Sequence, residues 1–119
     1  MTPTDLLTFD QIGSVQVVTI TARELTSALA EDLSTRLLTI LNESHTRLFV
    51  IDFSQVQYME SACLGSLVQF LKWLAHEEGR IAVAGVQENV RFLFRVTKLD
   101  KVFPLCTDVP SAIRVMEQP

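Results

Sequence analysis

RLFVIDFSQVQYMESACLG, residues 47–65, joins two segments with different hydrophobic patterns and decides the fold. Four consecutive apolar residues, Leu48 to Ile51, are typical of a central strand that is covered on both faces. From Ser61 onward, apolar residues recur at three- and four-residue steps, which predicts an amphipathic helix over 61–79. A buried strand, a loop and an amphipathic helix in succession indicate an α/β protein.

The same change of pattern repeats along the rest of the chain. Further strands are predicted at 14–21, 80–86 and 101–106, and helices at 26–44, 87–99 and 109–118. One additional strand is considered within 4–10. Alternation of this kind predicts a small mixed, mostly parallel β-sheet of four to five strands with about four helices. With no linker or internal repeat, one domain spanning residues 1–119 is expected.

Local signals refine these elements. Thr26 or Ser27 is expected to cap the first helix. Gly79 is expected to end the 61–79 helix in a left-handed conformation. Pro104 is expected either to place strand 101–106 at a sheet edge or to end it. The residues of helix 87–99 that are expected to face inward are Val90, Leu93, Phe94 and Val96.

Composition narrows the class of protein. The chain has 48% hydrophobic and 20% charged residues and a net charge of −4, which is typical of a globular domain and disfavours nucleic-acid binding. Cys63 and Cys106 lie far apart with no histidine at metal spacing, so neither a metal site nor a disulfide framework is expected. The sequence shows no secretory signal pattern and no apolar stretch of membrane-spanning length, so a cytoplasmic protein without a cofactor is expected.

Functional sites in α/β sheets collect where strands end and helices begin, which here is the stretch from Asp52 to Ser61. The 21–27 loop is expected to approach from the neighbouring strand. A catalytic serine needs a base within hydrogen-bond reach. His76 lies fifteen residues further along the same helix, roughly 22 Å from Ser61, and His45 is expected at the opposite end of the sheet. An enzyme is therefore not expected.

Two roles remain open for Ser61. Serine is a favoured N-cap, because its hydroxyl accepts a hydrogen bond from a free backbone N–H. The same helix end also suits a phosphate, because free N–H groups and the positive end of the helix dipole attract a dianion. Nearby Cys63 is interpreted as a small buried hydrophobe rather than a reactive thiol.

The stretch from residue 48 to 105, within a similarity running from about Val15 to Ile113, resembles the STAS domains of bacterial anti-sigma factor antagonists. In that family an apolar strand ends in Asp or Asn, and Asp-Ser-(Ser/Thr)-Gly-Leu-Gly opens the next helix. The resemblance implies that Ser61 is phosphorylated by an anti-sigma factor that is also a serine-protein kinase. It further implies that the unphosphorylated form binds this partner, and that a phosphatase of the PP2C type removes the phosphate.

The resemblance also implies which residues bind the partner. These are Glu24, Thr26, Tyr58, Glu60, Ser61, Ala62, Cys63 and Gly65. The chain departs from the family pattern at several of them: Glu60 replaces Asp, Ala62 replaces a hydroxyl residue, Cys63 replaces Gly and Thr26 replaces Asp. Lys98 stands where Gly is frequent. The alternative is a constitutive STAS subunit, in a phospholipid-transport complex or a stressosome-like scaffold, without phosphate turnover.

Overall fold

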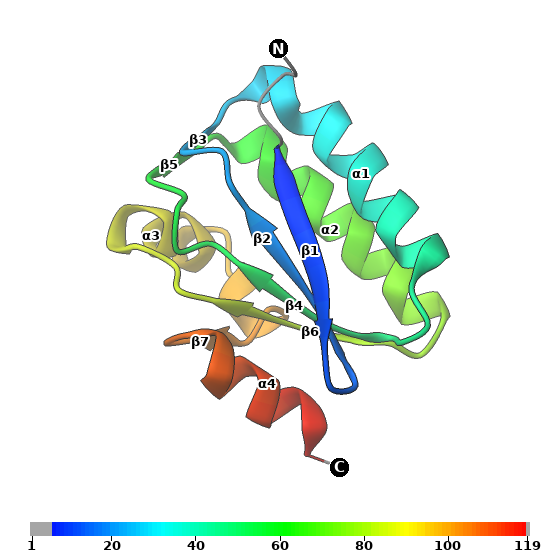
Figure 1. Cartoon of the computed structure of the whole chain (residues 1–119). Coiled ribbons are helices and arrows are strands. Elements are labelled where there is room, and N and C mark those ends of the chain that lie inside the picture. The colour runs from blue at the N-terminus through cyan, green and yellow to red at the C-terminus, as the bar shows by residue number, and fades with distance from the viewer. Residues whose placement is uncertain (1–5, 119) are drawn as a thin grey trace.

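The computed structural model describes residues 6–118, which form a five-stranded sheet with helices on both faces (Figure 1). The strands in spatial order are β1 (Leu7–Ile12), β2 (Val15–Ile20), β4 (Leu48–Asp52), β6 (Arg80–Ala84) and β7 (Leu105–Cys106). β1 and β2 form an antiparallel hairpin, and every other neighbouring pair is parallel. The predicted α/β fold and the central place of β4 are confirmed.

Four helices cover this sheet, and short elements join them. The helices are α1 (Ala30–Glu43), α2 (Ser61–His76), α3 (Glu88–Val96) and α4 (Val109–Glu117), and the 3-10 turns are η1 (Ser27–Leu29) and η2 (Leu99–Lys101). A separate parallel pair, β3 (Glu24–Leu25) and β5 (Tyr58–Met59), lies beside the start of α2 (Figure 1). The apolar side chains of α1, α2 and α3 pack on one face of the sheet, and those of α4 pack on the other.

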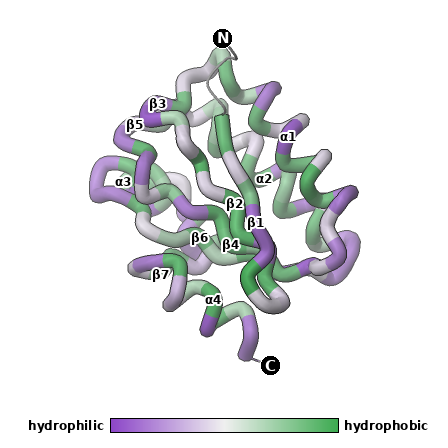
Figure 2. Tube along the Cα trace, viewed as in Figure 1, coloured by the Kyte–Doolittle hydropathy of each residue, from purple (hydrophilic) through white to green (hydrophobic). Residues whose placement is uncertain are grey.

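Strand alternation explains this layering. In β4, Phe49 and Ile51 join the core under α1 and α2, whereas Val50 points to α4. In β6, Ala82 and Ala84 face α4, and their small side chains let that helix approach closely. Hydrophobic residues accordingly fill the centre of the sheet, whereas the β3, β5 and α3 region is more hydrophilic (Figure 2).

The two predicted edge strands differ in extent from the sequence interpretation. The strand expected within 4–10 is found as β1, with positions 4 and 5 outside the described residues. The strand expected at 101–106 shrinks to Leu105–Cys106, because residues 99–101 form a 3-10 turn instead. β7 is an edge strand, as Pro104 predicted.

The C-terminal end of α2 differs from the predicted one. The left-handed residue after α2 is Glu78, with φ of 60°, and not Gly79. Glu78 and Gly79 donate to the carbonyls of Ala75 and Leu74, at 3.0 and 2.9 Å, in the pattern of a Schellman motif. Glycine is needed at position 79 for a different reason: a Cβ there would lie 2.2 Å from the Leu74 side chain.

Two other expectations about helices were wrong. Neither Thr26 nor Ser27 caps α1: a 3-10 turn precedes that helix, and Thr26 makes no side-chain cap bond. Val96 is 55% exposed rather than inward. Val90 and Phe94 are buried four residues apart, and Val96, two residues beyond Phe94, therefore lies on the opposite side of α3.

Candidate functional site

Helix α2 begins at Ser61, and Glu60 is its N-cap residue. Ser61 is therefore the first residue inside the helix, and the N-cap role considered for it is wrong. The cause lies in the preceding strand: the Glu60 N–H donates to the Leu25 carbonyl at 2.8 Å, which continues the β5 pairing and keeps Glu60 extended, with φ −91° and ψ 153°. The chain turns helical only after this bond.

The β3–β5 pair joins the 21–27 segment to the start of α2. The predicted approach of the 21–27 loop to this site is thus confirmed. The N–H groups of Gln57 and Tyr58 donate to the Arg23 carbonyl at 2.8 and 3.2 Å. The Arg23 guanidinium also donates to the Gln57 side-chain oxygen at 3.1 Å. On the far side of β5, the Asn89 side chain of α3 donates to the Gln57 carbonyl. Three segments distant in sequence thus meet at one place.

The Glu60 carboxylate is bonded on both oxygens. Its Oε1 accepts from the Ser27 backbone N–H at 2.5 Å and from the Ser27 hydroxyl at 2.6 Å. Its Oε2 accepts from the Tyr58 hydroxyl at 3.2 Å. The bonds from the Ser27 hydroxyl and N–H hold the pKa of Glu60 below its ordinary value, and the bond to the carboxylate raises the pKa of Tyr58. Glu60 is therefore a carboxylate held ionised between two segments.

Ser61, Ala62 and Gly65 are exposed on one face of α2. Ser61 and Gly65 are four residues apart and so lie one turn above each other. A Cβ built at Gly65 would meet nothing within 4 Å, so the bare backbone there serves no internal packing. Gln69, one further turn along, is also exposed on this face and was not predicted as a site residue. We call Ser61, Ala62, Gly65 and Gln69 the α2 stripe.

The remaining predicted residues divide into surface and interior. Glu24 and Tyr58 are exposed, and Thr26 is half-buried. Cys63 is fully buried, and its thiol donates to the Thr26 carbonyl at 3.3 Å. The expectation that Cys63 contacts a partner directly is therefore wrong for its side chain, because the third residue of α2 faces the core.

Burial, and secondarily the Glu60 charge, raises the pKa of the Cys63 thiol, which keeps it protonated at neutral pH. Neither histidine approaches Ser61. His76 is the last residue of α2, and His45 follows α1 in the loop before β4. Among residues 6–118 no group hydrogen-bonds the Ser61 hydroxyl. The hydroxyl is thus open to solvent and without a base of its own.

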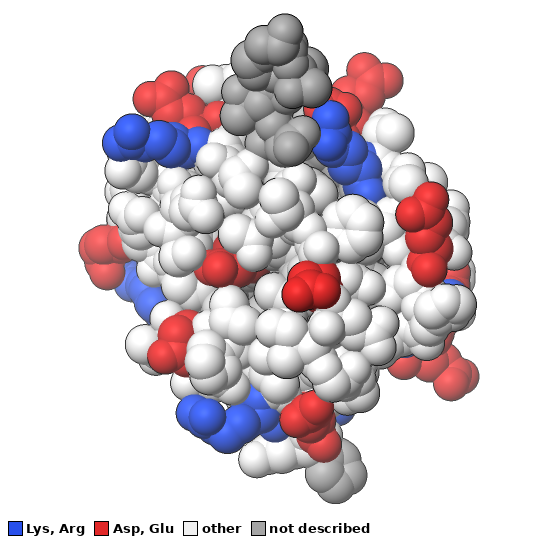
Figure 3. All heavy atoms as spheres, viewed as in Figure 1, with Lys and Arg blue, Asp and Glu red and all other residues white. Residues whose placement is uncertain are grey.

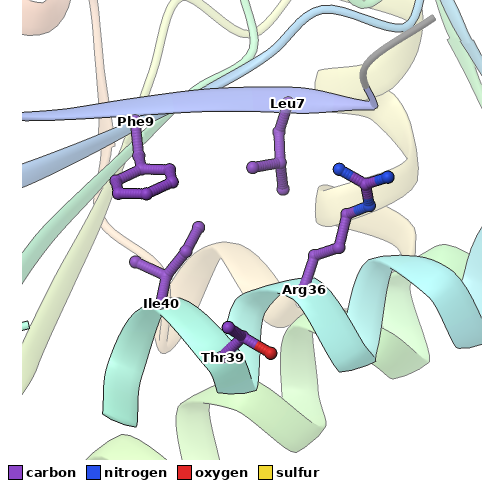
Figure 4. Close-up of a pocket in the computed structure, with 5 residues that line it drawn as sticks. All are labelled: Leu7, Phe9, Arg36, Thr39 and Ile40. Carbon is purple, nitrogen blue, oxygen red and sulfur yellow. The ribbon is translucent and has the colours of Figure 1, made fainter. Parts of the chain in front are cut away.

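A separate groove of about 170 Å³ lies between β1 and α1 (Figure 4). Leu7 and Phe9 point from the strand toward Ile40 of the helix, with Arg36 and Thr39 beside them. None of the predicted site residues lines this groove. Within the described residues no helix has the length and apolar character needed to cross a membrane.

Residues 7–112 match the family model of the STAS domain, and the chain therefore belongs to the STAS domain family. Its fold is similar to the crystal structure of an anti-sigma factor antagonist from Mycobacterium paratuberculosis, with a TM-score of 0.83 and 25% identity over 94% of this chain and 93% of that chain.

Two further solved structures share the fold. An anti-sigma factor antagonist (STAS) domain protein from Planctomyces limnophilus has a TM-score of 0.86 at 20% identity, covering 94% of this chain and 98% of that one. The phosphorylated form of the Bacillus cell fate determinant SpoIIAA has a TM-score of 0.68 at 16% identity, covering 92% and 98%. Anti-sigma factor antagonists thus recur among the structural neighbours of this protein.

Proposed function

We propose that this protein is an anti-sigma factor antagonist that works by partner switching, with Ser61 as the phosphate acceptor. The observation that carries the proposal is the exposed Ser61 hydroxyl at the first position of α2, inside a STAS fold. Unphosphorylated protein binds an anti-sigma factor that is also a serine-protein kinase, and phosphorylation releases it. A phosphatase of the PP2C type returns the free hydroxyl.

The helix end suits the phosphorylated state. Ser61 and Ala62 are the first two residues of α2, where no helical carbonyl lies one turn earlier to accept from their N–H groups. Those groups and the helix dipole favour a dianion at this position. The added charge lies close to the Glu60 carboxylate and on the exposed side of the helix, so it acts mainly on a protein docked there.

The protein is a substrate in this scheme and not the catalyst. The Ser61 oxygen forms a bond to the γ-phosphorus of ATP, the bond to the β-phosphate oxygen breaks, ADP leaves, and the hydroxyl proton passes to a base of the kinase. ATP and magnesium are bound by the partner. The absence of a base beside Ser61 and the buried, protonated Cys63 support this division of labour.

The docking surface comprises the α2 stripe and the neighbouring β3–β5 edge, including Glu24 and Tyr58. On the face seen in Figure 3, acidic and basic side chains are dispersed among uncharged ones, with two acidic groups near the middle, and no continuous basic patch is visible. This pattern supports a protein partner recognised by shape and local polarity rather than a nucleic acid.

A constitutive STAS subunit is the second candidate. This chain has Glu60, Ala62 and Cys63 where the family usually has Asp, Ser/Thr and Gly. These departures from the usual motif favour a constitutive subunit, in which the same docking surface binds its partner permanently. Genes beside this one distinguish the candidates: an anti-sigma kinase or a PP2C-type phosphatase supports the switch, and transporter components support the constitutive subunit.

The direct test uses the purified protein, the neighbouring anti-sigma kinase and ATP. Wild type should gain one phosphate by intact-mass measurement, Ser61→Ala should gain none, and Ser54→Ala, which alters another exposed serine, should behave as wild type. Ser61→Asp should weaken binding at least about tenfold, because it places a fixed negative charge at the docking surface. A phosphate mapped to another residue would exclude Ser61 as the switch.

A further inference from the structure

The Glu60 carboxylate supplies the start of η1, the 3-10 turn that leads into α1, with a cap that the local sequence lacks. Thr26 occupies the N-cap position of η1 but makes no side-chain cap bond, and Leu29 before α1 has no polar side chain. The first N–H of η1, that of Ser27, donates instead to Glu60 Oε1 at 2.5 Å. An acceptor thirty-three residues away in the chain thus satisfies this helix end.

This long-range cap depends on the length of the Glu60 side chain. The carboxylate crosses from α2 to η1 while its backbone stays bonded to Leu25. The family's usual Asp is one methylene shorter, and Thr26 lacks the carboxylate found there in relatives that read Gly-Glu-Leu-Asp. In this chain Glu60 therefore provides the negative charge at the start of η1 that position 26 does not.

The cap also lies directly beside the phosphate acceptor. Glu60 precedes Ser61, so their Cα atoms are about 3.8 Å apart. The groups that face the Glu60 carboxylate are Ser27 of η1 and Tyr58 of β5, with the Cys63 thiol behind it and Glu24 acting on Tyr58 from β3. Among the described residues, no lysine or arginine forms an ion pair with this carboxylate. A dianion on Ser61 would therefore repel a carboxylate that no ion pair holds in place.

We propose that Glu60 is a positioning residue that couples the state of Ser61 to the 24–29 segment. With a free Ser61 hydroxyl, the carboxylate accepts hydrogen bonds from Ser27 and Tyr58. These bonds fix the position of the 24–29 segment relative to the α2 stripe. A phosphate on Ser61 repels the carboxylate from its partners, and the 24–29 segment loses its tie to α2. This inference rests on the proposed function, and it adds a second consequence of phosphorylation besides direct repulsion of the partner.

The test follows the Ser27 amide by ¹⁵N NMR in the full chain between pH 3 and 7. In wild type this amide should titrate with the Glu60 carboxyl. Ser61→Glu, which needs no kinase, should move the Ser27 resonance upfield and shift its titration midpoint to higher pH. Gln69→Glu places the same charge two turns along the α2 stripe and should leave Ser27 nearly unchanged.

Ser111 provides an internal control, and two Glu60 variants separate the effect of charge from the effect of side-chain length. The Ser111 N–H donates to Asp108 at the start of α4, at 2.9 Å, and its titration should be the same in all variants. Glu60→Gln should abolish the pH response of Ser27. Glu60→Asp keeps the charge beside Ser61 but should lose the Ser27 response, because its side chain is too short.

The outcomes distinguish this coupling from the proposed function. An unchanged Ser27 titration in both Ser61→Glu and the phosphorylated protein overturns the coupling, even if Ser61 is phosphorylated and the partner leaves. A shifted Ser27 titration in Ser61→Glu supports it, even if no kinase modifies Ser61. Faster hydrogen exchange of the 24–29 amides in Ser61→Glu provides a second, independent readout.

Discussion

Ser61, Ala62 and Gly65 place small side chains on the exposed face of α2, where a partner's backbone would approach closely. Ser61 and Gly65 match the family pattern, and Ala62 differs from it by the loss of a hydroxyl, so the surface stays small and uncharged. The neighbouring departure, Cys63, is turned into the core, where it fills space and does not alter that surface. The departures at Cys63 and Glu60 therefore affect the interior and the hydrogen bonds from Ser27 to Glu60, and they leave the α2 stripe unaltered.

Gly65→Ala separates stability from binding at this stripe. The new methyl group meets no atom within 4 Å, and alanine favours the helix over glycine, so the free energy of unfolding should rise by about 0.5–1 kcal/mol. Partner binding should weaken, because the methyl group occupies the approach to Ser61. Thermal unfolding and titration calorimetry measure the two effects. Gln69→Ala is the control for general loss of side chain, and unchanged binding of Gly65→Ala would place the interface elsewhere.

At the scale of elements, the short connections carry conformations that the side chains do not favour. Lys98, between α3 and η2, has a left-handed backbone with φ of 61°. A residue with a Cβ is strained there, whereas glycine is not. The frequent glycine at this position in the family thus has a physical reason, and this chain tolerates the strain at an exposed turn.

Lys98→Gly should therefore stabilise the protein, by up to about 1 kcal/mol, because relief of the left-handed strain exceeds the added freedom of the unfolded chain. Urea unfolding followed by circular dichroism gives the change. Lys101→Gly, three residues on in η2, removes the same charge without relieving strain and should be neutral or destabilising. Equal effects of the two substitutions would show that charge and not backbone conformation is responsible.

At the scale of the whole molecule, a chain of aromatic contacts joins the end of β4 to α3 and to the segment between η2 and β7. Phe94 packs edge-to-face against Phe53 and Phe103, with ring centroids 6.1 and 5.9 Å apart. All three side chains are fully buried. The residue just after β4 is thus held by the same core that fixes α3.

Phe94→Ala should lower the free energy of unfolding by about 3–5 kcal/mol through lost burial and the cavity that remains. Phe92→Ala, on the exposed side of the same helix at 58% exposure, should change it by less than about 0.5 kcal/mol. Chemical unfolding of both variants tests the contrast. A small effect of Phe94→Ala would mean that the core around α3 relaxes to fill the space.

Hydrophobic periodicity determined the strands and helices of the sheet, the central place of β4 and the position of Ser61 where a strand gives way to a helix. These features depend on local pattern, because burial of one face imposes a repeat on neighbouring residues. The same patterns failed at helix ends, where Glu78 and Glu60 rather than Gly79 and Ser61 took the terminal roles.

Only the tertiary structure decided the β3–β5 pair and the bonds from Ser27 to Glu60. The physical reason is that two-residue strands and a single carboxylate leave no periodic trace in the sequence. Their partners lie more than thirty residues away, and the chain had to fold before those groups could meet. Sequence thus located the hydroxyl, and folding supplied the carboxylate that holds its surroundings.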